Sequence, residues 1–598
     1  MKAFLRTTLA SIVGTLVAIT LIFIMGGMLI FSMAISSSSP KMKLEDNSIL
    51  KLDLSSVIVE QKDNSIDFLS LITNNDIPTV VSLTDILTAI RNAKTEPKIK
   101  GIYIKAGYMS IGYAKAGEIH DALLDFKESG KFIYCYAEAM NEKGYYVASV
   151  ADEIYMHPIG AMEFNGLSSQ VMFYTGALEK LGVEMQIVKH GEFKSAVEVY
   201  TRTSMSDASR EQSKVLLNDI WGVLVKSMST SKGITVDELN KIANDDALFT
   251  YSSNKLVDYG MIDGYQYTDE IKDDLNAKIK NDDEKDDEND DKDKAKYKLI
   301  SILKYCSLIN ENKKEYDSKI KIIYADGAID MGRDGINSED IEDAIKKAKN
   351  DDDVKAIVLR VNSPGGSVFG SEDMWRAVVE AKKEKPVVVT MGDYAASGGY
   401  YMSCAADYIF AEPNTITGSI GIYGTIPNLK GLVTDKLGLT FDEVETHENA
   451  DFIGSGMRGM NEFERNLMQE QIETGYDIFV TRVADGRSMS KDSVMKIAEG
   501  RVWSGARAKE LGLVDSMGGI EAAIDKAAEL AGLEEYSIAE SRKQDFFEKF
   551  LSNMQMKAEE KAIKERIGEQ AYRLLESANN LQIKKEIYAK MPFEFDIE

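Results

Sequence analysis

The chain has 598 residues, of which 44% are hydrophobic, and it carries a formal net charge of −26. Its hydrophobic content is ample for packed cores, and its length suits two large domains. A charge this negative repels phosphate at long range, so it argues against a nucleic-acid partner and against binding to an anionic membrane surface. The cysteines, Cys135, Cys306 and Cys404, lack metal-ligand spacing, so we predict neither a metal site nor a disulfide framework.

The N-terminus predicts a membrane anchor. Residues 7–35 carry no charged side chain and follow Lys2 and Arg6. Such a run is long enough to cross a bilayer with some tilt, which makes the membrane lipid a partner of residues 7–35. Because the nearby positive charges precede the run, the tail is expected in the cytoplasm and the rest of the chain outside. We therefore assign residues 1–36 to a cytoplasmic tail and an uncleaved, single-pass anchor in the inner membrane of a bacterium, with the later domains extracytoplasmic or periplasmic.

After the anchor, two stretches of the chain repeat one another at an offset of 255 residues. DILTAIRNAK from Asp85 reappears as DIEDAIKKAK from Asp340, and GYYVAS from Gly144 reappears as GYYMSC from Gly399. Two copies, each about the size of a domain, indicate a tandem duplication and not a solenoid.

The domain boundaries follow from these repeats and from composition. We place the first repeat over residues 45–280 and the second over residues 319–535. The run NDDEKDDENDDKDK at 281–294 has no apolar residue and cannot contribute to a core, so we assign 281–318 to an acidic insertion and linker. The region 536–598 is rich in Lys, Glu, Ala and Leu and predicts a helical C-terminal tail.

Within each repeat, short β-rich apolar runs alternate with helical patterns, which predicts an α/β fold with a helix-covered parallel sheet. In the second repeat the expected strands are Lys319–Ile329, Ala356–Asn362, Pro386–Gly392 and Asp407–Pro413, and the expected helices are Ser338–Asn350 and Ser371–Lys385. In such folds the functional groups gather where strands end.

Two motifs follow strands of the second repeat. NSPGG, ending at Gly366, lets the backbone turn sharply and present N–H groups, as an oxyanion hole requires. GDYAASGG passes from a strand into a helix, with small residues around Ser397 and the N–H of Gly398 beside it. In the first repeat, the residue that matches Ser397 is Glu142, and GYMSI replaces NSPGG. The second repeat alone therefore supplies a candidate nucleophile.

A serine nucleophile needs a base. The histidines lie in no recognisable triad signature, which disfavours a Ser-His-Asp mechanism without excluding it; they are His120, His157, His190 and His447. The remaining common choice is a lysine that burial makes neutral. Lys194, in GEFKSAVEVY, has small and apolar neighbours and is the candidate, whereas the second repeat has no lysine between Lys436 and Lys491.

The motifs NSPGG, GDYAASGGYY, TGSIGIYG and GRVWSGARAKELGLVD, in this order, resemble the signal peptide peptidase A (protease IV) family in its long, two-repeat, membrane-anchored bacterial form. The resemblance implies a duplicated fold like that of Clp protease and crotonase. It implies Ser397 as nucleophile, Lys194 as general base and Ser419 as the residue that orients the lysine, with the N–H groups of Gly366 and Gly398 as oxyanion hole. No cofactor is implied.

The resemblance also implies partners. Signal peptides and other hydrophobic peptides are the expected substrates, and a homotetramer is the expected assembly. Two other functions stay open from the sequence: a catalytically inactive, membrane-tethered scaffold or chaperone-like protein of the same fold, and an acyl-CoA enzyme of the crotonase kind, which a position outside the membrane disfavours. Whether Ser397 and Lys194 meet within one chain or across subunits is also open.

Overall fold

The structure is a computed structural model, and it describes residue 14 and residues 43–61, 80–246, 248–250, 254–280, 297–331, 335–541 and 587–590. The predicted anchor at 7–35 and the acidic run at 281–294 lie outside these residues, apart from Gly14. Among the described residues, no helix has the length and apolar character needed to span a bilayer.

The first repeat is built on a seven-stranded sheet in the order β10-β1-β4-β5-β6-β8, with β9 also paired to β6. Its strands are parallel except β8, which runs antiparallel to β6. The strands are β1 (Ser48–Asp53), β4 (Ile99–Ala106), β5 (Phe132–Met140), β6 (Glu153–Glu163), β8 (Leu248–Thr250), β9 (Gly264–Tyr265) and β10 (Lys298–Ser301).

The second repeat has an eight-stranded sheet with the same plan, in the order β18-β16-β14-β12-β11-β20, with β15 also paired to β14 and β19 paired to β15. Here too the strands are parallel except one, β18, which is antiparallel to β16. The strands are β11 (Lys319–Asp326), β12 (Val354–Ser363), β14 (Val387–Ala396), β15 (Tyr408–Ala411), β16 (Ile416–Gly418), β18 (Val502–Ser504), β19 (Ser516–Met517) and β20 (Ser537–Glu540). The matching strand orders confirm the predicted α/β duplication.

Helices follow these strands as the sequence pattern predicts. α13, for example, spans Ser338–Asn350 and begins where the side chain of Asn337 accepts the N–H groups of Glu339 and Asp340, which a helix start leaves without intrahelical partners. The helices packed near the sheets are α3 (Leu83–Thr95), α4 (Tyr113–Lys127), α5 (Glu142–Ala148), α12 (Ile302–Asn312), α13, α14 (Val368–Ala381), α15 (Gly398–Ser403), α18 (Gly505–Glu510) and α19 (Ile520–Ala531).

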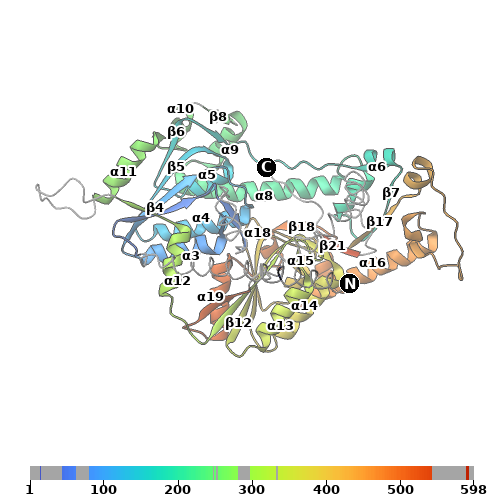
Figure 1. The fold of residues 1–598 in the computed structure, drawn as a ribbon. Helices are drawn as coiled ribbons and strands as arrows, with labels where there is room; N and C mark the ends of the chain where they lie inside the picture. The colour runs from blue at the N-terminus through green and yellow to red at the C-terminus, as the bar shows by residue number, and fades with distance from the viewer. Residues whose placement is uncertain are drawn as a thin grey trace, which may run out of the picture.

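Two long helices and a small sheet extend from the repeats (Figure 1). The helices are α8 (Asp207–Lys232) and α16 (Glu462–Gly486), accompanied by α6 (Thr175–Leu181), α7 (Glu198–Thr201), α9 (Val236–Asp245), α10 (Asn254–Asp258), α11 (Thr268–Lys280) and α17 (Lys491–Met495). The small sheet has the order β13-β21-β17-β7 and contains β13 (Gly365–Ser367), β21 (Ile587–Lys590), β17 (Tyr423–Asn428) and β7 (Glu184–Lys189). A two-stranded sheet of β2 (Val57–Val59) and β3 (Val80–Ser82) completes the described strands.

The two repeats share one interior. A single cluster of buried apolar residues includes Leu50 and Ile104 of the first repeat together with Ile320 and Val358 of the second. Burial of this kind is the main favourable contribution to folding, so it also holds the repeats together.

Polar contacts between the repeats cap helices in both directions. Asp393, on β14, accepts the N–H of Ala114 at 3.1 Å and of Lys115 at 3.2 Å, at the start of α4. In return Glu118, on α4, accepts the N–H of Ile520 at 2.8 Å, at the start of α19. Each repeat therefore supplies a carboxylate where the other leaves helix N–H groups without partners.

Two sequence-based boundaries need correction. The segment assigned to an insertion and linker at 281–318 includes β10 and α12, and β10 pairs with β1 as an outer strand of the first sheet. The tail predicted to be helical at 536–598 includes β20, which pairs with β11 in the equivalent place, and β21. Composition alone missed these strands because each has only four residues and gains its stability from a neighbouring strand.

Candidate active site

Ser397 occupies a strained turn between β14 and α15. Its backbone angles are φ 56° and ψ −114°, and positive φ is uncommon outside glycine, so neighbouring contacts must hold it. Its N–H donates to the carbonyl of Gly418 and its carbonyl accepts the N–H of Tyr401, both at 2.8 Å. The turn places the serine at the carboxyl end of a central strand, where α/β folds hold their sites.

Lys194 reaches this turn from the first repeat. It follows β7 and directly precedes a short 3₁₀ turn at Ser195–Val197. Its Nζ lies 2.8 Å from Oγ of Ser397, a hydrogen-bonding distance, and both side chains are completely buried. The serine and the lysine predicted from separate repeats therefore meet within one chain.

Ser419 lies on the other side of the lysine amine. Nζ of Lys194 donates to its Oγ at 3.0 Å and to its carbonyl at 3.2 Å. Ser419 has φ 51° and follows β16; its N–H donates to the carbonyl of Arg501 at 2.7 Å, and its Oγ lies 3.2 Å from the carbonyl of Gly500. The lysine amine thus lies between Ser397 and Ser419, and the orienting role that the sequence resemblance implies for Ser419 stays a prediction.

Burial disfavours the charged form of the lysine. The pKa of Lys194 lies well below its ordinary value of 10.5 because the completely buried amine loses the water that would stabilise its charged form. The groups within hydrogen-bonding distance are the hydroxyls of Ser397 and Ser419 and one carbonyl, none of which carries a charge. A neutral amine has a lone pair and accepts a proton, which is what a general base does.

Residues that the sequence analysis missed hold the lysine loop against the second repeat. Gln212, on α8, donates from Nε2 to the carbonyl of Phe193 at 3.0 Å and to Oγ of Ser195 at 2.8 Å. The N–H of Phe193 donates to the carbonyl of Glu499 at 3.1 Å. Gly500 has φ 79°, and a Cβ built there would lie 2.6 Å from Cβ of Lys194. The sequence AEGR contains Gly500 but does not reveal its positive φ, so the sequence alone could not identify this contact with the lysine loop.

The glycine turn lies next to the serine turn. Gly365 and Gly366 begin β13 with φ 97° and 159°, and a Cβ on Gly366 would lie 2.2 Å from the carbonyl oxygen of Ile329. A Cβ on Gly399 would lie 2.6 Å from the carbonyl oxygen of Ser363. Gly398 is the first residue of α15, where a backbone N–H has no intrahelical acceptor. The close approach of these backbones explains why glycine is needed in both motifs.

The matching place in the first repeat has a different chemistry. Glu142 begins α5 and is buried; its Oε1 accepts the N–H of Asn165 at 2.8 Å, and burial raises its pKa. The side chain of Asn141 binds the N–H and the carbonyl of Met109 in GYMSI, both at 3.3 Å. Here the side chain of Asn141 binds the backbone in the place of the glycine turn, and Glu142 stands where the second repeat has Ser397.

The histidines are engaged elsewhere in the described part of the chain. His120 is stacked on Tyr146, and His190 is stacked on Tyr476 with its Nδ1 2.6 Å from Glu473. No hydrogen bond joins a histidine to Ser397 among the described residues. The Ser-His-Asp alternative is therefore unsupported by the geometry.

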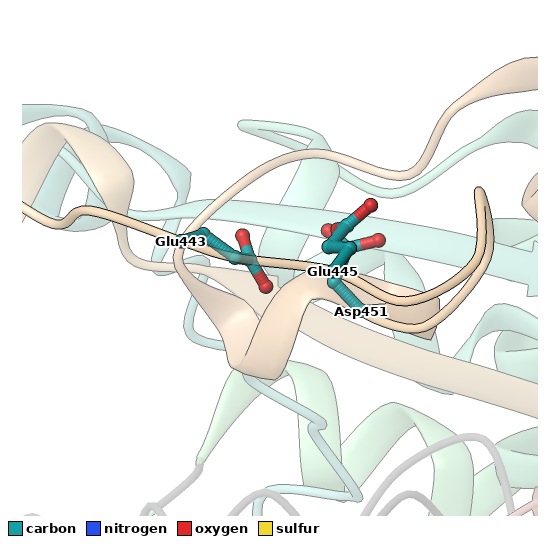
Figure 2. A group of neighbouring side chains, drawn as sticks. All are labelled: Glu443, Glu445 and Asp451. Carbon is teal, nitrogen blue, oxygen red and sulfur yellow. The ribbon is translucent and has the colours of Figure 1, made fainter.

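Three acidic residues lie close together, as in a cation site, but we assign no metal ion to them. Glu443, Glu445 and Asp451 place carboxylate oxygens within 4.8 Å of one another. Figure 2 shows these three side chains. Both glutamates are exposed, and Arg458 pairs with the carboxylate of Asp451, which removes part of the negative charge a cation would need.

The three cysteines are buried and unpaired, in keeping with packing residues.

Comparison with known proteins identifies the class. The family model described as peptidase family S49 matches residues 125–281 and 380–534, one stretch in each repeat. Protease 4 of Haemophilus influenzae is 33% identical over 519 residues, covering 85% of this chain and 83% of its own length. Protease 4 of Salmonella typhi is 34% identical over 76% of this chain and 73% of its own length.

A plant relative extends the comparison. The chloroplastic serine protease SPPA of Arabidopsis thaliana is 31% identical over 76% of this chain and 66% of its own length. A solved ClpP1 chain from Listeria monocytogenes covers 34% of this chain with 15% identity and a TM-score of 0.23, too low to support the Clp and crotonase relation, which stays a prediction. The duplicated α/β fold and these matches define a peptidase. More particularly, the chain belongs to peptidase family S49.

Proposed function

We propose that the chain is a membrane-anchored serine endopeptidase that uses Ser397 and Lys194 as a catalytic dyad. The observation that carries the proposal is the 2.8 Å approach of a buried lysine Nζ to a buried serine Oγ. The membership of a peptidase family supports hydrolysis of peptide bonds. The catalytic roles below rest on this geometry and on the motifs in the sequence.

The first half of the reaction forms an acyl-enzyme. Two N–H bonds of neutral Lys194 donate to Oγ and the carbonyl of Ser419, which leaves the lone pair directed at the hydroxyl of Ser397. The lysine takes the hydroxyl proton while Oγ attacks the substrate carbonyl. The N–H groups of Gly366 and Gly398 stabilise the oxyanion, the peptide C–N bond breaks, and the lysine returns the proton to the leaving amine.

The second half releases the product. Lys194 takes a proton from water, and the hydroxide attacks the ester carbon. The bond to Oγ of Ser397 then breaks, and the lysine returns the proton to Oγ. Lys194 accepts and returns the proton in both halves of this cycle, and burial matters because a charged lysine cannot begin it.

The proposed substrates are cleaved signal peptides and other hydrophobic peptides at a membrane. The support is the uncharged run at 7–35, which predicts an anchor that would keep the site near the bilayer. The proposed location is the extracytoplasmic face of a bacterial inner membrane, and the proposed assembly is a homotetramer, as the sequence resemblance implies.

The test is cleavage of a hydrophobic peptide by the detergent-solubilised full chain. We expect Ser397→Ala and Lys194→Ala each to lower kcat by at least about 10³-fold, since each removes one of two groups that act as a unit. Matched controls are Ser403→Ala and Lys143→Ala. Ser403 and Lys143 are also well packed, but their side chains donate to the carbonyls of Gly399 and Ile111.

Three outcomes separate the alternatives. Full activity in both dyad variants would refute the dyad. Inactivity of the wild type towards peptides would favour a scaffold or chaperone-like protein of the same fold. Hydrolysis of a CoA thioester in place of peptides would favour an acyl-CoA enzyme.

A further inference from the structure

The motif that carries Lys194 also contains a buried carboxylate that takes no part in the catalytic cycle. Glu198 is 5% exposed and begins α7, after the short turn that follows Lys194. Both of its oxygens bind Ser206: Oε2 accepts the N–H at 2.9 Å and Oε1 accepts the hydroxyl at 2.6 Å. Ser206 is the N-cap of α8, where its own Oγ accepts the N–H of Ser209 at 3.1 Å. Glu198 therefore ties the far end of the lysine loop to the start of α8.

The same helix binds the near end of the loop. Gln212, also on α8, donates from Nε2 to the carbonyl of Phe193 at 3.0 Å and to Oγ of Ser195 at 2.8 Å. Phe193 and Ser195 are the neighbours of Lys194 in the chain. α8 thus holds the loop at two points, through Gln212 beside the lysine and through Glu198 beyond it. A segment fixed at both ends has few conformations open to it, so its side chain keeps one direction.

α8 is in turn bound to the second repeat at the start of β18. Glu211 pairs with Arg501 at 3.1 Å. Oε1 of Gln212 accepts the N–H of Val502 at 3.3 Å. The carbonyl of Arg501 accepts the N–H of Ser419 at 2.7 Å. The helix that holds the lysine loop is therefore fixed relative to the serine that lies beside the lysine amine.

We propose that Glu198 is a positioning residue, which clamps the lysine loop to α8 together with Gln212 and so keeps Nζ of Lys194 beside the nucleophile. The consequence for catalysis rests on the proposed peptidase function, whereas the clamp itself does not. The carboxylate of Glu198 binds Ser206 and not the lysine amine, so it acts through the backbone of the loop. When the clamp is broken, the fraction of molecules with the amine beside the serine hydroxyl falls.

The first experiment removes the carboxylate in the full chain. Glu198→Ala deletes both contacts to Ser206, whereas Glu198→Gln keeps an oxygen that accepts one of them. We expect Glu198→Ala to lower kcat for a hydrophobic peptide at least about tenfold, because a displacement of about 1 Å at a catalytic group costs about 10²-fold. Glu198→Gln is expected to lose less than about threefold, since one contact remains. An unchanged kcat in Glu198→Ala would overturn the proposal.

Glu238→Ala is the matched control. Glu238 accepts the N–H of Thr235 at 3.0 Å and its hydroxyl at 2.7 Å, and Thr235 is the N-cap of α9. This contact has the same form as that of Glu198, but no hydrogen bond joins α9 to the lysine loop among the described residues. We expect Glu238→Ala to keep the wild-type kcat. Equal losses in the two alanine variants would mean that the loss of any helix cap is enough, and would refute a positioning role.

The pH profile of kcat/KM separates positioning from a smaller folded fraction. A smaller folded fraction lowers the rate by one factor at every pH. A loosened loop instead lets water reach the amine of Lys194, whose pKa is lowered by burial, so that pKa rises towards 10.5 and the acid limb moves to higher pH by about one unit. An acid limb of Glu198→Ala at the wild-type pH would contradict the proposal.

The last experiment does not depend on catalysis. Hydrogen–deuterium exchange of the wild type and of Glu198→Ala, both as full chains, is followed by mass spectrometry. We expect the segment 193–206 to exchange at least about tenfold faster in Glu198→Ala, with β14 unchanged. Unchanged exchange at 193–206 would show that Glu198 does not hold the loop. If the wild type and every variant lack peptidase activity, the peptidase function fails, while the exchange still decides whether the clamp exists.

Discussion

At the scale of single residues, the site depends on two unfavourable states that the surrounding fold maintains. Ser397 has a positive φ, and Lys194 is a buried amine whose charged form is destabilised. Either state alone costs free energy, so each is supported by neighbours, such as the carbonyl of Gly418 for Ser397 and Ser419 for the lysine. Strain and desolvation together place the hydroxyl of Ser397 beside an amine whose charged form is disfavoured.

The lowered pKa of Lys194 predicts the pH dependence of activity. Protonated lysine cannot accept the serine proton, so kcat/KM falls about tenfold per pH unit below that pKa and reaches a plateau above it. The measurement is a pH profile of kcat/KM for the wild type. An acid limb that begins only near the ordinary lysine value of 10.5 would contradict a desolvated base.

The lowered pKa of Lys194 also predicts how the free energy of unfolding changes with pH. The folded state binds fewer protons than the unfolded state between the lowered pKa of Lys194 and 10.5, so this residue makes the free energy of unfolding rise with pH across that window. Lys194→Met removes this contribution. We therefore expect the melting temperature of Lys194→Met to exceed that of the wild type by more at pH 6 than at pH 9.

At the scale of elements, the lysine is positioned by contacts that cross between repeats. The loop after β7 donates the N–H of Phe193 to the carbonyl of Glu499 and lies against Gly500. Gln212 on α8, which binds the same loop, also accepts the N–H of Val502 at 3.3 Å. No element of the first repeat alone aims Nζ at Ser397. The loop conformation is a property of the interface, and small changes in the opposing turn should change the site.

Gly500→Ala tests this dependence. A Cβ at Gly500 would lie 2.6 Å from Cβ of Lys194 and would also strain a backbone with φ 79°. We expect a loss of kcat/KM of about 10² or more, because a displacement of about 1 Å at a catalytic group costs about that factor. Gly512→Ala is the control: its φ is 78°, but the nearest atom to a Cβ is Sδ of Met489 at 3.9 Å.

The comparison of these two variants separates strain from displacement. Both substitutions carry the backbone cost of alanine at positive φ, about 1 kcal/mol. If activity falls equally in the two variants, general destabilisation explains the loss. If only Gly500→Ala loses activity, contact with the lysine loop explains it.

At the scale of the whole molecule, buried charges join the repeats. Arg360 on β12 is 1% exposed and binds Glu60 at 2.9 Å and Glu118 at 2.6 Å, both from the first repeat. Its positive charge partly offsets the burial that raises the pKa of Glu118. Neither repeat alone satisfies these groups, so the molecule is expected to unfold as one unit.

Arg360→Met is predicted to destabilise the protein by about 3–5 kcal/mol, since it leaves Glu118 buried without its cation and Glu60 with only Lys115, 3.8 Å away. The measurement is urea denaturation followed by tryptophan fluorescence. Arg376→Met is the control, because its pairing with Glu380 is an exposed contact within one helix and is worth about 0.5 kcal/mol or less. Equal midpoints for the two variants would contradict a structural role for the buried network.

Much of the second repeat follows from local sequence. α13 matches the predicted helix Ser338–Asn350, and β14 begins one residue after the expected strand Pro386–Gly392, at Val387. These elements were predictable because periodic apolar residues and capping side chains lie within a few residues of one another. β10, β20 and β21 were missed because short strands depend on partners far along the chain.

By itself the sequence determined the duplication, the α/β alternation and the identity of Ser397 and Lys194 as candidates, since repeated spacing and small-residue turns are visible in one dimension. Only the tertiary structure decided that Nζ reaches Oγ within one chain, that Gln212 and Gly500 hold the lysine loop, and that β21 lies between β13 and β17. The physical reason is that desolvation, close backbone approach and strand pairing arise between residues that folding alone brings together.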